Sequence, residues 1–351
     1  MIFLYQALKL FGNKKRSLKK ISTGDIFSSV KVSKSTKKIV SSKKEFLFPA
    51  YITILDTTYR FNKKLGMGSY GIVGLYSQPN SLINFFTKES NSDNLPKEVV
   101  VKLFTDPEQY NNERNNYKIF HSDKKLSGVI GKYYGSFTVQ SKQSYYGIII
   151  EKFESDLLDR EISKNLTFNE AFDYCSQIAN ILSRVHAKKI CINDLKTENI
   201  MIDSNNKLRL IDLCLSGDYL GSNSHFCYTP NFIPPKLIQD QIMCLPNDIW
   251  SFGIICFSFF LQRQWPTVDV DSSRSQSFSE TGFSYSPEEI KTLVDKSTHF
   301  EPHKSWVLTL LIGKNGKSGI LHPDNNKRWD IRTTLKHFKR YKGVAYKSKL
   351  D

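Results

Sequence analysis

The hydrophobic periodicity of the chain changes part-way along, and this change constrains the fold more than any other feature. Between residues 59 and 151, β-branched and aromatic residues cluster in short runs such as EVVVKLF and SYYGIIIEKF, which is typical of strands. From residue 167, TFNEAFDYCSQIANILSRVHAKK repeats apolar residues three and four positions apart, which predicts an amphipathic helix. The later DIWSFGIICFSFFLQ is apolar on all faces, as a buried helix would be. We therefore expect an α+β fold with a small β-rich half and a larger helical half.

The start of the chain differs in composition from the rest. Its first 50 residues hold twelve Lys or Arg against two acids, in a chain whose formal net charge is +16. Such a segment attracts nucleic acid, an anionic surface or acidic partners, but a solvated tail has the same composition, and both alternatives stay open. The expected divisions are a Lys/Ser-rich extension over 1–55, a folded domain over 56–341 (β-rich to about 151, helical from about 155) and a C-terminal tail over 342–351.

Membrane insertion and zinc binding are both disfavoured by the sequence. No run reaches the roughly 18 apolar residues that a membrane-spanning helix needs. The apolar start MIFLYQALKLF lacks the basic region and cleavage pattern of a signal peptide, so we expect a packed strand, a tail or an amphipathic surface helix there. The six Cys are scattered without a C-x-x-C pair, which disfavours zinc and indicates reduced thiols in an intracellular protein.

A glycine-rich stretch, LGMGSYGIVGLY, places Gly66, Gly68 and Gly71 in a G-x-G-x-x-G pattern. A dinucleotide-binding fingerprint would need a helix directly after it, but Ile72 and Val73 continue a strand. A hairpin whose glycines let backbone N–H groups approach phosphates fits better, and an ordinary tight turn is the alternative for this motif taken alone.

The next candidate is Lys102, which comes near the end of the strand-like run VVVK. A lysine on a strand that follows a phosphate-binding hairpin can reach the phosphates if an acid on the next helix holds its ammonium. Such a helix is predicted over PEQYNNERNNYKIFH, with Asp106 as its cap. Glu113 is the preferred partner on this helix and Glu108 is its competitor.

A second cluster of polar residues lies in CINDLKTENIMI and in the following LRLIDL. The first stretch places Asp194, Lys196 and Asn199 at a spacing that suggests phosphate transfer, and the second ends with Asp212 after a strand-like run. Eighteen residues separate the two aspartates, which is enough for two short strands that bring both to one cleft.

Taken in order, these motifs resemble those of the eukaryotic-type protein kinase family over residues 57 to 341. NDLKTEN resembles the catalytic loop, LIDLCLSG the D-F-G segment, YTPNFIPPKL the end of the activation segment and NDIWSFG the buried helix, while HPDNNKRWDIRTTLKH resembles the last family motif. The resemblance implies a bilobal protein kinase-like fold, with a small β-rich N-lobe and a larger helical C-lobe, that binds ATP and Mg²⁺ or Mn²⁺.

The resemblance also implies a role for each candidate residue. Asp194 would accept the proton of the substrate hydroxyl or orient it, and Lys196 would neutralise the γ-phosphate, in a pattern typical of serine/threonine kinases. Asn199 and Asp212 would hold the metal through oxygen atoms. Lys102 would bind the phosphates with Glu113 as its partner. The residues expected around ATP are Leu65, Gly66, Gly68, Ser69, Gly71, Val73, Val100, Lys102, Glu151, Phe153 and Met201, with the hinge at 151–153.

Four positions depart from the family pattern. Ile192 replaces a His and should preserve packing beside Leu213 and Tyr117. Asn193 replaces an Arg that pairs with an activation-segment phosphate, so we expect activity that does not depend on such a phosphate. The other two departures are Cys214 for a Gly, expected to be buried and inert, and Lys236 for the Glu that would pair with Arg328, which leaves Arg328 in need of another partner.

The groups that would handle proton, phosphate and metal are all retained. The sequence therefore predicts an intracellular, monomeric serine/threonine protein kinase. A pseudokinase scaffold that binds nucleotide or a partner is the first alternative, and a small-molecule kinase of the same fold is the second.

Overall fold

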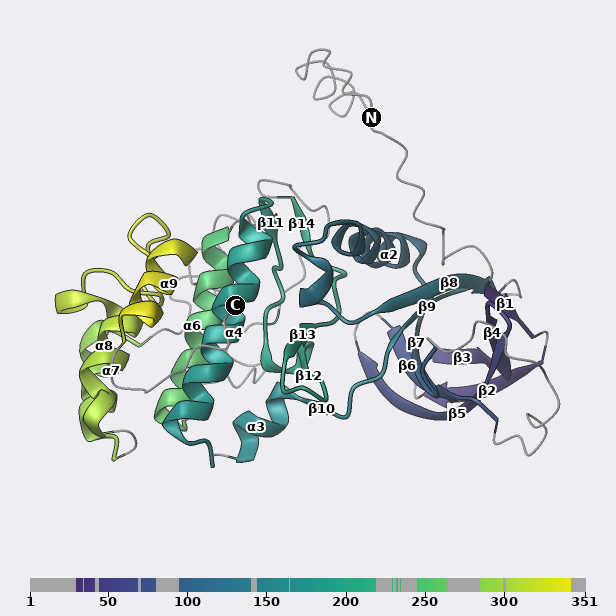
Figure 1. The fold of residues 1–351 in the computed structure, drawn as a ribbon, viewed down its shortest axis with the longest axis horizontal. Coiled ribbons are helices and arrows are strands. Elements are labelled where there is room, and N and C mark those ends of the chain that lie inside the picture. The colour runs from purple at the N-terminus through teal and green to yellow at the C-terminus, as the bar shows by residue number, and fades with distance from the viewer. Residues whose placement is uncertain are drawn as a thin grey trace, which may run out of the picture.

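The computed structural model describes residues 30–33, 35–41, 44–68, 71–79, 95–139, 144–163, 165–218, 229, 232, 234, 245–263, 285–298 and 301–341. They form a sheet-rich small lobe and a helical large lobe joined near residue 153, as Figure 1 shows. Among the described elements, nine strands and helix α2 come before residue 153, and the other α-helices come after it, which confirms the predicted α+β fold with two lobes. None of the described helices combines the length and apolarity needed to cross a membrane.

The small lobe is built on one antiparallel sheet of seven strands. Their order across the sheet is β1-β4-β5-β6-β7-β9-β8. The bounds are β1 (Val30–Val32), β4 (Tyr51–Ile54), β5 (Thr57–Gly68), β6 (Gly71–Ser77), β7 (Glu98–Phe104), β8 (Tyr133–Val139) and β9 (Tyr145–Glu151). A separate hairpin pairs β2 (Thr36–Ser41) with β3 (Lys44–Pro49).

Helix α2 (Pro107–Ser122) packs against this sheet. Its start follows the sequence prediction, because the Asp106 carboxylate accepts a hydrogen bond from the Glu108 amide at 2.8 Å and proline occupies the first helical position. Its buried residues recur at helical spacing and include the charged Glu113. The helix thus carries a carboxylate into the interior between the lobes.

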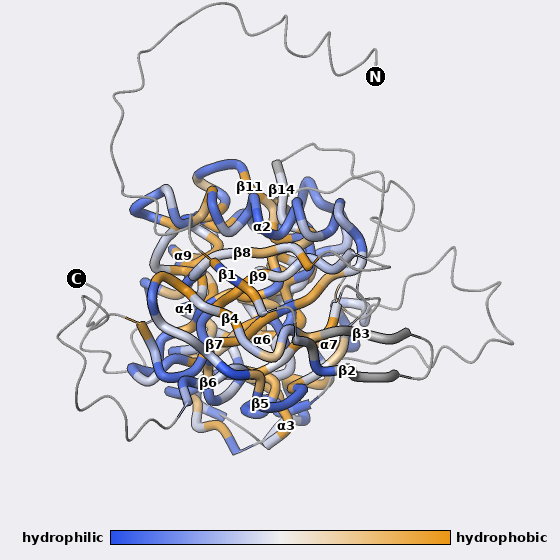
Figure 2. Tube along the Cα trace, turned by 90° about the vertical axis from the view of Figure 1, so that its right-hand side faces the viewer, coloured by the Kyte–Doolittle hydropathy of each residue, from blue (hydrophilic) through white to orange (hydrophobic). Residues whose placement is uncertain are grey.

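The strands β1 to β4 fall within the stretch predicted to be an extension, so the boundary expected near residue 55 is too late. β1 and β4 belong to the main sheet, and Phe48, Ile52 and Ile54 are buried beneath it. The sheet curves until β1 lies against β8, its opposite edge (Figure 1). Figure 2, seen from the small-lobe side, shows apolar stretches along strands of the main sheet. Lysines and serines between the apolar residues conceal this pattern in the sequence.

Residues 1–29 lie outside the described residues, together with six of the twelve basic residues of the first 50. The binding of nucleic acid or an anionic surface by this stretch stays a prediction.

Phe48 links the early strands to the glycine-rich hairpin. Its ring stacks on Phe61 with centroids 4.9 Å apart, and a Cβ added at Gly74 would come within 2.7 Å of it. We expect Phe48→Ala to lower the free energy of unfolding by about 3–5 kcal/mol, as for a large side chain removed from a core. Urea unfolding would measure this, with Tyr51→Ala, at a 41% exposed position, changing stability by less than about 0.5 kcal/mol. Equal effects of the two variants would show that Phe48 is not part of the core.

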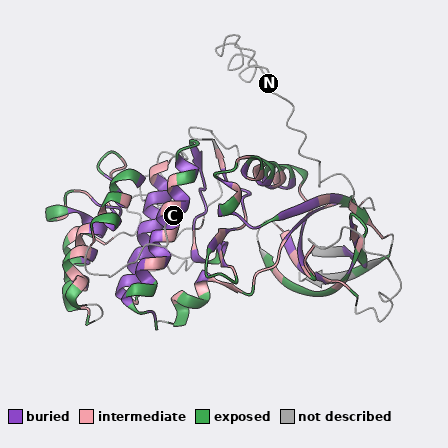
Figure 3. Cartoon of the chain, in the orientation of Figure 1, coloured by how far each residue is buried: buried purple, intermediate pink, exposed green. Residues whose placement is uncertain are grey.

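The large lobe is organised around two long helices. These are α4 (Phe168–His186), which opens with a capping box between Thr167 and Glu170, and α6 (Leu245–Leu261). Figure 3 shows both as mostly buried, with the remaining helices more exposed around them. Those helices are α3 (Leu157–Ser163), α7 (Pro287–Lys296), α8 (Lys304–Ile312) and α9 (Ile331–Arg340).

Short strands form the side of the large lobe that faces the sheet. β12 (Ile200–Ile202) pairs with β10 (Ser155–Asp156) and β13 (Leu208–Leu210), and β11 (Ile190–Cys191) pairs with β14 (Gly217–Asp218). The loops at the ends of these strands carry the polar candidates from the sequence, so the pairing decides which of them meet. The 3-10 turns are η1 (Ser127–Val129), η2 (Thr197–Asn199), η5 (Glu301–His303) and η6 (Lys314–Gly316).

Candidate active site

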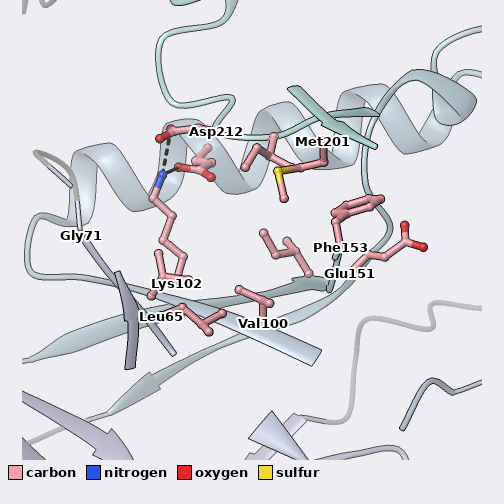
Figure 4. Close-up of a pocket in the computed structure, with 12 residues that line it drawn as sticks. Leu65, Gly71, Val100, Lys102, Glu151, Phe153, Met201 and Asp212 are labelled. Atoms are coloured by element: carbon pink, nitrogen blue, oxygen red, sulfur yellow. Dashed lines mark hydrogen bonds and ion pairs between the residues drawn. The ribbon is translucent and has the colours of Figure 1, made fainter. Parts of the chain in front are cut away.

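A pocket opens between the two lobes. It is lined by Leu65, Gly71, Val73, Val100, Lys102, Glu113, Ile150, Glu151, Phe153, Met201, Ile211 and Asp212. In Figure 4, Val100 and Met201 face each other across it, one from each lobe. Eight of the eleven residues expected around ATP therefore line one pocket. Of the others, Gly66 and Gly68 lie on β5 outside the lining, and Ser69 is outside the described residues.

Two lining residues were missed in the sequence. Ile150 ends an isoleucine run on β9, and Ile211 directly precedes Asp212. Both are ordinary core residues by pattern. For Ile150, only the alternation of side chains along β9 could have suggested that it turns toward the pocket.

The glycine-rich stretch forms the predicted hairpin of β5 and β6. Gly68 pairs with Gly71, and β6 continues as a strand to Ser77, which excludes the helix that a dinucleotide fingerprint requires. Gly71 lies so close to β7 that an added Cβ would come within 2.3 Å of the Leu103 carbonyl oxygen. The hairpin can therefore approach its neighbour only with glycine at this position.

Lys102 lies at the centre of a buried group of charges. Its ammonium is 2.7 Å from Glu113 Oε2 and 2.8 Å from Asp212 Oδ1, and Lys102 and Glu113 are 7% and 0% exposed. The expected pair of Lys102 with Glu113 is thus present, and Figure 4 shows Lys102 reaching Asp212 across the back of the pocket. Three elements, β7, α2 and the stretch after β13, meet at this ammonium.

The pKa values of this group follow from burial and from the ratio of charges. Burial raises the pKa of Glu113 to about 7, even though the ammonium of Lys102 acts to lower it. Burial alone would lower the pKa of Lys102, but the carboxylates of Glu113 and Asp212 outweigh it, so the pKa is raised. Lys102 thus stays protonated, whereas Glu113 titrates near neutral pH.

A second polar cluster lies in the loop after β11. Lys196 Nζ is 2.9 Å from Asp194 Oδ2 and donates to Thr229 Oγ1 at 2.8 Å, while the Thr229 hydroxyl donates to Asp194 Oδ1 at 2.7 Å. Thr229 was not assigned to the site from the sequence. Its contact crosses 35 residues of chain, which no local pattern indicates.

Asp248 on α6 fixes the backbone that carries Asp194. Its carboxylate accepts hydrogen bonds from the Ile192 and Asn193 amides at 2.9 Å each and lies 2.9 Å from His186 Nε2. The carboxylate is 1% exposed, so these bonds are not weakened by water. The backbone of this loop is therefore fixed relative to α4 and α6, which carry His186 and Asp248.

The β12–β13 hairpin brings the two predicted metal ligands together. Asn199 precedes β12, Asp212 follows β13, and the Ile211 amide donates to the Asn199 carbonyl at 3.0 Å. Asn199 Nδ2 donates to the Asp194 carbonyl and to Asp194 Oδ2, at 3.0 and 2.9 Å, which turns its amide oxygen away from Asp194. Amide and carboxylate oxygens are ligands that suit Mg²⁺.

Within the described part of the chain, no three His, Cys, Asp or Glu side chains form a group that could hold a metal ion. Mg²⁺ is usually bound through one or two protein ligands, and Asn199 and Asp212 could supply them.

Comparison with known proteins agrees with this geometry. The family model described as Protein kinase domain matches residues 59–338. The chain belongs to the protein kinase domain family. The fold and the order of motifs in this kinase domain are those expected from the resemblance, and the family uses ATP and a divalent metal ion, generally Mg²⁺.

The curated relatives are named as kinases, and several of them as serine/threonine-protein kinases. Aurora kinase A-B of Xenopus laevis is 28% identical over 162 residues, which cover 44% of this chain and 40% of the relative. The Aurora kinase of Dictyostelium discoideum is 29% identical over 50% of this chain and 47% of its own length. Serine/threonine-protein kinase PKH2 of Candida albicans is 24% identical over 71% of this chain and 27% of the relative. The matches thus span less than half of these relatives.

Three of the departures from the family pattern can be located in the kinase domain. Ile192, Leu213 and Tyr117 are all buried in the core, as expected. Cys214 is also buried, and burial raises the pKa of its thiol to about 12, which disfavours the reactive thiolate. Asn193 adopts a φ of 66°, a conformation that Asn tolerates better than most residues.

Arg328 has partners other than the Glu that the family pattern would supply. Its guanidinium donates to the carbonyl oxygens of His322, Pro246 and Pro323, and it lies over the Trp250 ring at 5.0 Å. Backbone carbonyls thus satisfy the cation. Lys236 lies outside the described residues.

Proposed function

We propose that this chain is an active protein kinase that transfers the γ-phosphate of ATP to serine or threonine hydroxyls of proteins. The observation that carries the proposal is the convergence of two clusters beside one pocket. Lys102 is held between Glu113 and Asp212, and Asp194 is held between Lys196 and Thr229. The curated relatives named as serine/threonine-protein kinases support the hydroxyl specificity.

The proposed mechanism assigns positioning and charge stabilisation to the protein, as phosphoryl transfer requires. Adenine would lie between Val100 and Met201 and meet the backbone of residues 151–153. Lys102, oriented by Glu113, would bind phosphate oxygens. Asp194 would orient the acceptor hydroxyl and take its proton, while the nearby Lys196 would offset charge on the transferring group.

Asn199 and Asp212 would hold Mg²⁺, which neutralises phosphate charge when bound. Their own part is to present oxygens from the two ends of one hairpin. Thr229 Oγ1 lies within hydrogen-bond distance of both Asp194 and Lys196, so it would keep the carboxylate turned toward the acceptor position.

A transfer assay tests the proposal. The purified chain would be incubated with γ-labelled ATP, Mg²⁺ and a basic or acidic acceptor protein, and the labelled residues would be identified after hydrolysis. We expect label on serine or threonine. Nucleotide binding without transfer to any acceptor would instead support the pseudokinase alternative, and label only on small hydroxyl compounds would support a small-molecule kinase.

The titration of Glu113 predicts a pH dependence of the activity. As the pH falls through about 7, its carboxylate takes up a proton and the ion pair with Lys102 is lost. We therefore expect kcat/KM for ATP, which reports the free enzyme, to fall about tenfold for each pH unit below about 7. Glu113→Gln should lower activity at all pH values and abolish this limb.

The contribution of Glu113 to the free energy of unfolding should change with pH in the opposite direction to the activity, so it should be larger at low pH. The pKa of Glu113 is about 7 in the folded chain and 4.5 as its ordinary value, so the folded state binds the proton more tightly. The stabilisation by this protonation is fully present below about pH 4.5 and is lost as the pH rises through about 7. Thermal unfolding of the wild type and of Glu113→Gln across this range would measure it. Parallel curves for the two proteins would contradict the assignment.

A further inference from the structure

The four residues after Asp212 are held by side-chain amides rather than by charges. Leu213, Cys214, Leu215 and Ser216 are all buried. Asn116 Nδ2 donates to the carbonyl oxygens of Leu213 and Ser216, at 2.7 and 2.8 Å. Asn193 Nδ2 donates to the Leu215 carbonyl at 2.8 Å. Three of the four carbonyls of the segment 213–216 therefore accept a hydrogen bond from an asparagine.

The orientation of both amides is fixed by the chemistry of their partners. A carbonyl oxygen can only accept, so the NH₂ group of each asparagine must face it, and no exchange of amide nitrogen and oxygen is compatible with these contacts. For Asn116 two carbonyls impose the same orientation. The contacts are thus specific hydrogen bonds rather than close packing alone.

The two asparagines come from the two parts of the site. Asn116 lies three residues after Glu113 on α2, so the helix that orients Lys102 also holds the segment. Asn193 directly precedes Asp194 in the loop anchored by Asp248. Any movement of the segment would therefore break contacts with both the small-lobe helix and the catalytic loop.

The backbone next to the segment 213–216 is strained and needs the support of these hydrogen bonds. Asp212 has a φ of 56° and Asn193 a φ of 66°, both in the left-handed region that costs energy for residues with a Cβ. The Ser216 hydroxyl donates to the Ile192 carbonyl at 3.4 Å, and β14 then pairs with β11. The second half of the segment is thus joined to the loop that carries Asp194.

We propose that Asn116 and Asn193 are positioning residues that keep the segment 213–216, and with it Asp212, in the arrangement needed for phosphate transfer without a phosphorylated activation segment. The proposal rests on the proposed kinase activity. At the position where the family carries an arginine that pairs with a phosphate, this chain has Asn193, whose amide donates directly to the Leu215 carbonyl.

Cys214 provides a test that is independent of activity. It lies inside the held segment and is 6% exposed, so an alkylating reagent should reach it only when the segment opens. The rate of alkylation of Cys214 by iodoacetamide at one fixed pH would be measured by peptide mass spectrometry. Asn116→Leu keeps the size of the side chain and removes its donor. Asn193→Gly removes the other donor and tolerates the positive φ. Asn115→Leu, at an exposed position of the same helix, is the matched control.

We expect Cys214 to be alkylated at least tenfold faster in Asn116→Leu and in Asn193→Gly than in the wild type or Asn115→Leu. Their kcat should fall at least tenfold, with the control unchanged. Wild-type activity should survive treatment with a phosphatase. If one variant fails to fold by circular dichroism, the other decides.

Unchanged alkylation in the folded variants, or loss of wild-type activity after phosphatase treatment, would overturn the proposal. A wild type that transfers no phosphate would refute the proposed function, while the alkylation rates would still show whether the two amides hold the segment. As a further check that no phosphate on these side chains is needed, Ser222 and Ser224, which lie outside the described residues, can be replaced together by Ala. Thr229 is left unchanged in this check, because its contact with Asp194 makes it part of the site.

Discussion

Asp194→Asn is expected to lower the rate of phosphate transfer by about 10²–10⁴-fold, the usual contribution of a general base. The replacement has nearly the same shape but cannot take a proton, and it leaves Lys196 without the charge that now lies 2.9 Å from its ammonium. The ATP pocket does not include Asp194, so the affinity for ATP should change little. Single-turnover transfer and equilibrium binding of a fluorescent ATP analogue would measure the two effects separately.

The matched control is Asp159→Asn, which makes the same chemical change at an exposed position of α3. It should retain wild-type transfer. If Asp194→Asn also retained transfer to within tenfold of the wild type, Asp194 would not be the group that handles the acceptor hydroxyl.

Lys102→Met is expected to lower kcat/KM by about 10²–10³-fold, as the loss of one preorganised donor to a developing charge typically does. It should also destabilise the fold, because removing one member of a buried ion pair leaves the partner charge without compensation, at a cost of about 3–5 kcal/mol. Since Glu113 can take up a proton as the pH falls through about 7, the destabilisation should be larger at about pH 8 than at about pH 6.

A double variant separates the two effects. Lys102→Met with Glu113→Leu removes the buried carboxylate as well, so it should recover stability without recovering activity. Lys188→Met is the control, since Lys188 forms a partly exposed ion pair with Asp123 and surface pairs contribute about 0–1 kcal/mol. A double variant no more stable than Lys102→Met would contradict the view that unpaired charge is the cause.

The parts of the site that follow from local spacing could be predicted from the sequence. The glycine hairpin, the cap of α2 and the pair of Lys102 with Glu113 depend on residues at most 17 positions apart along the chain. Residues so close along the chain can be paired in only a few ways by a hairpin or a strand followed by a helix. The positions of Asn199 and Asp212 at the two ends of one hairpin follow for the same reason.

The parts that could not be predicted depend on contacts distant in sequence. Asn116 reaches residues about 100 positions later, and Arg328 reaches a carbonyl 82 positions earlier. Their partners are backbone carbonyls, which every residue has, so no pairing of residue types marks them. The early strands were missed for a related reason: what buries Phe48 is a sheet formed later in the chain.

The curved sheet of the small lobe affects how many unpaired backbone groups its edge strands expose to other molecules. A strand at the border of a sheet presents unpaired N–H and C=O groups on which a second molecule can add its own strand. Here β1 covers β4, and its other side lies against β8, so the two borders shield each other. A chain shortened to the residues that match the family, 59–338, would lose β1 and β4 and leave β5 bare. The early strands thus cover the backbone groups along the open side of β5.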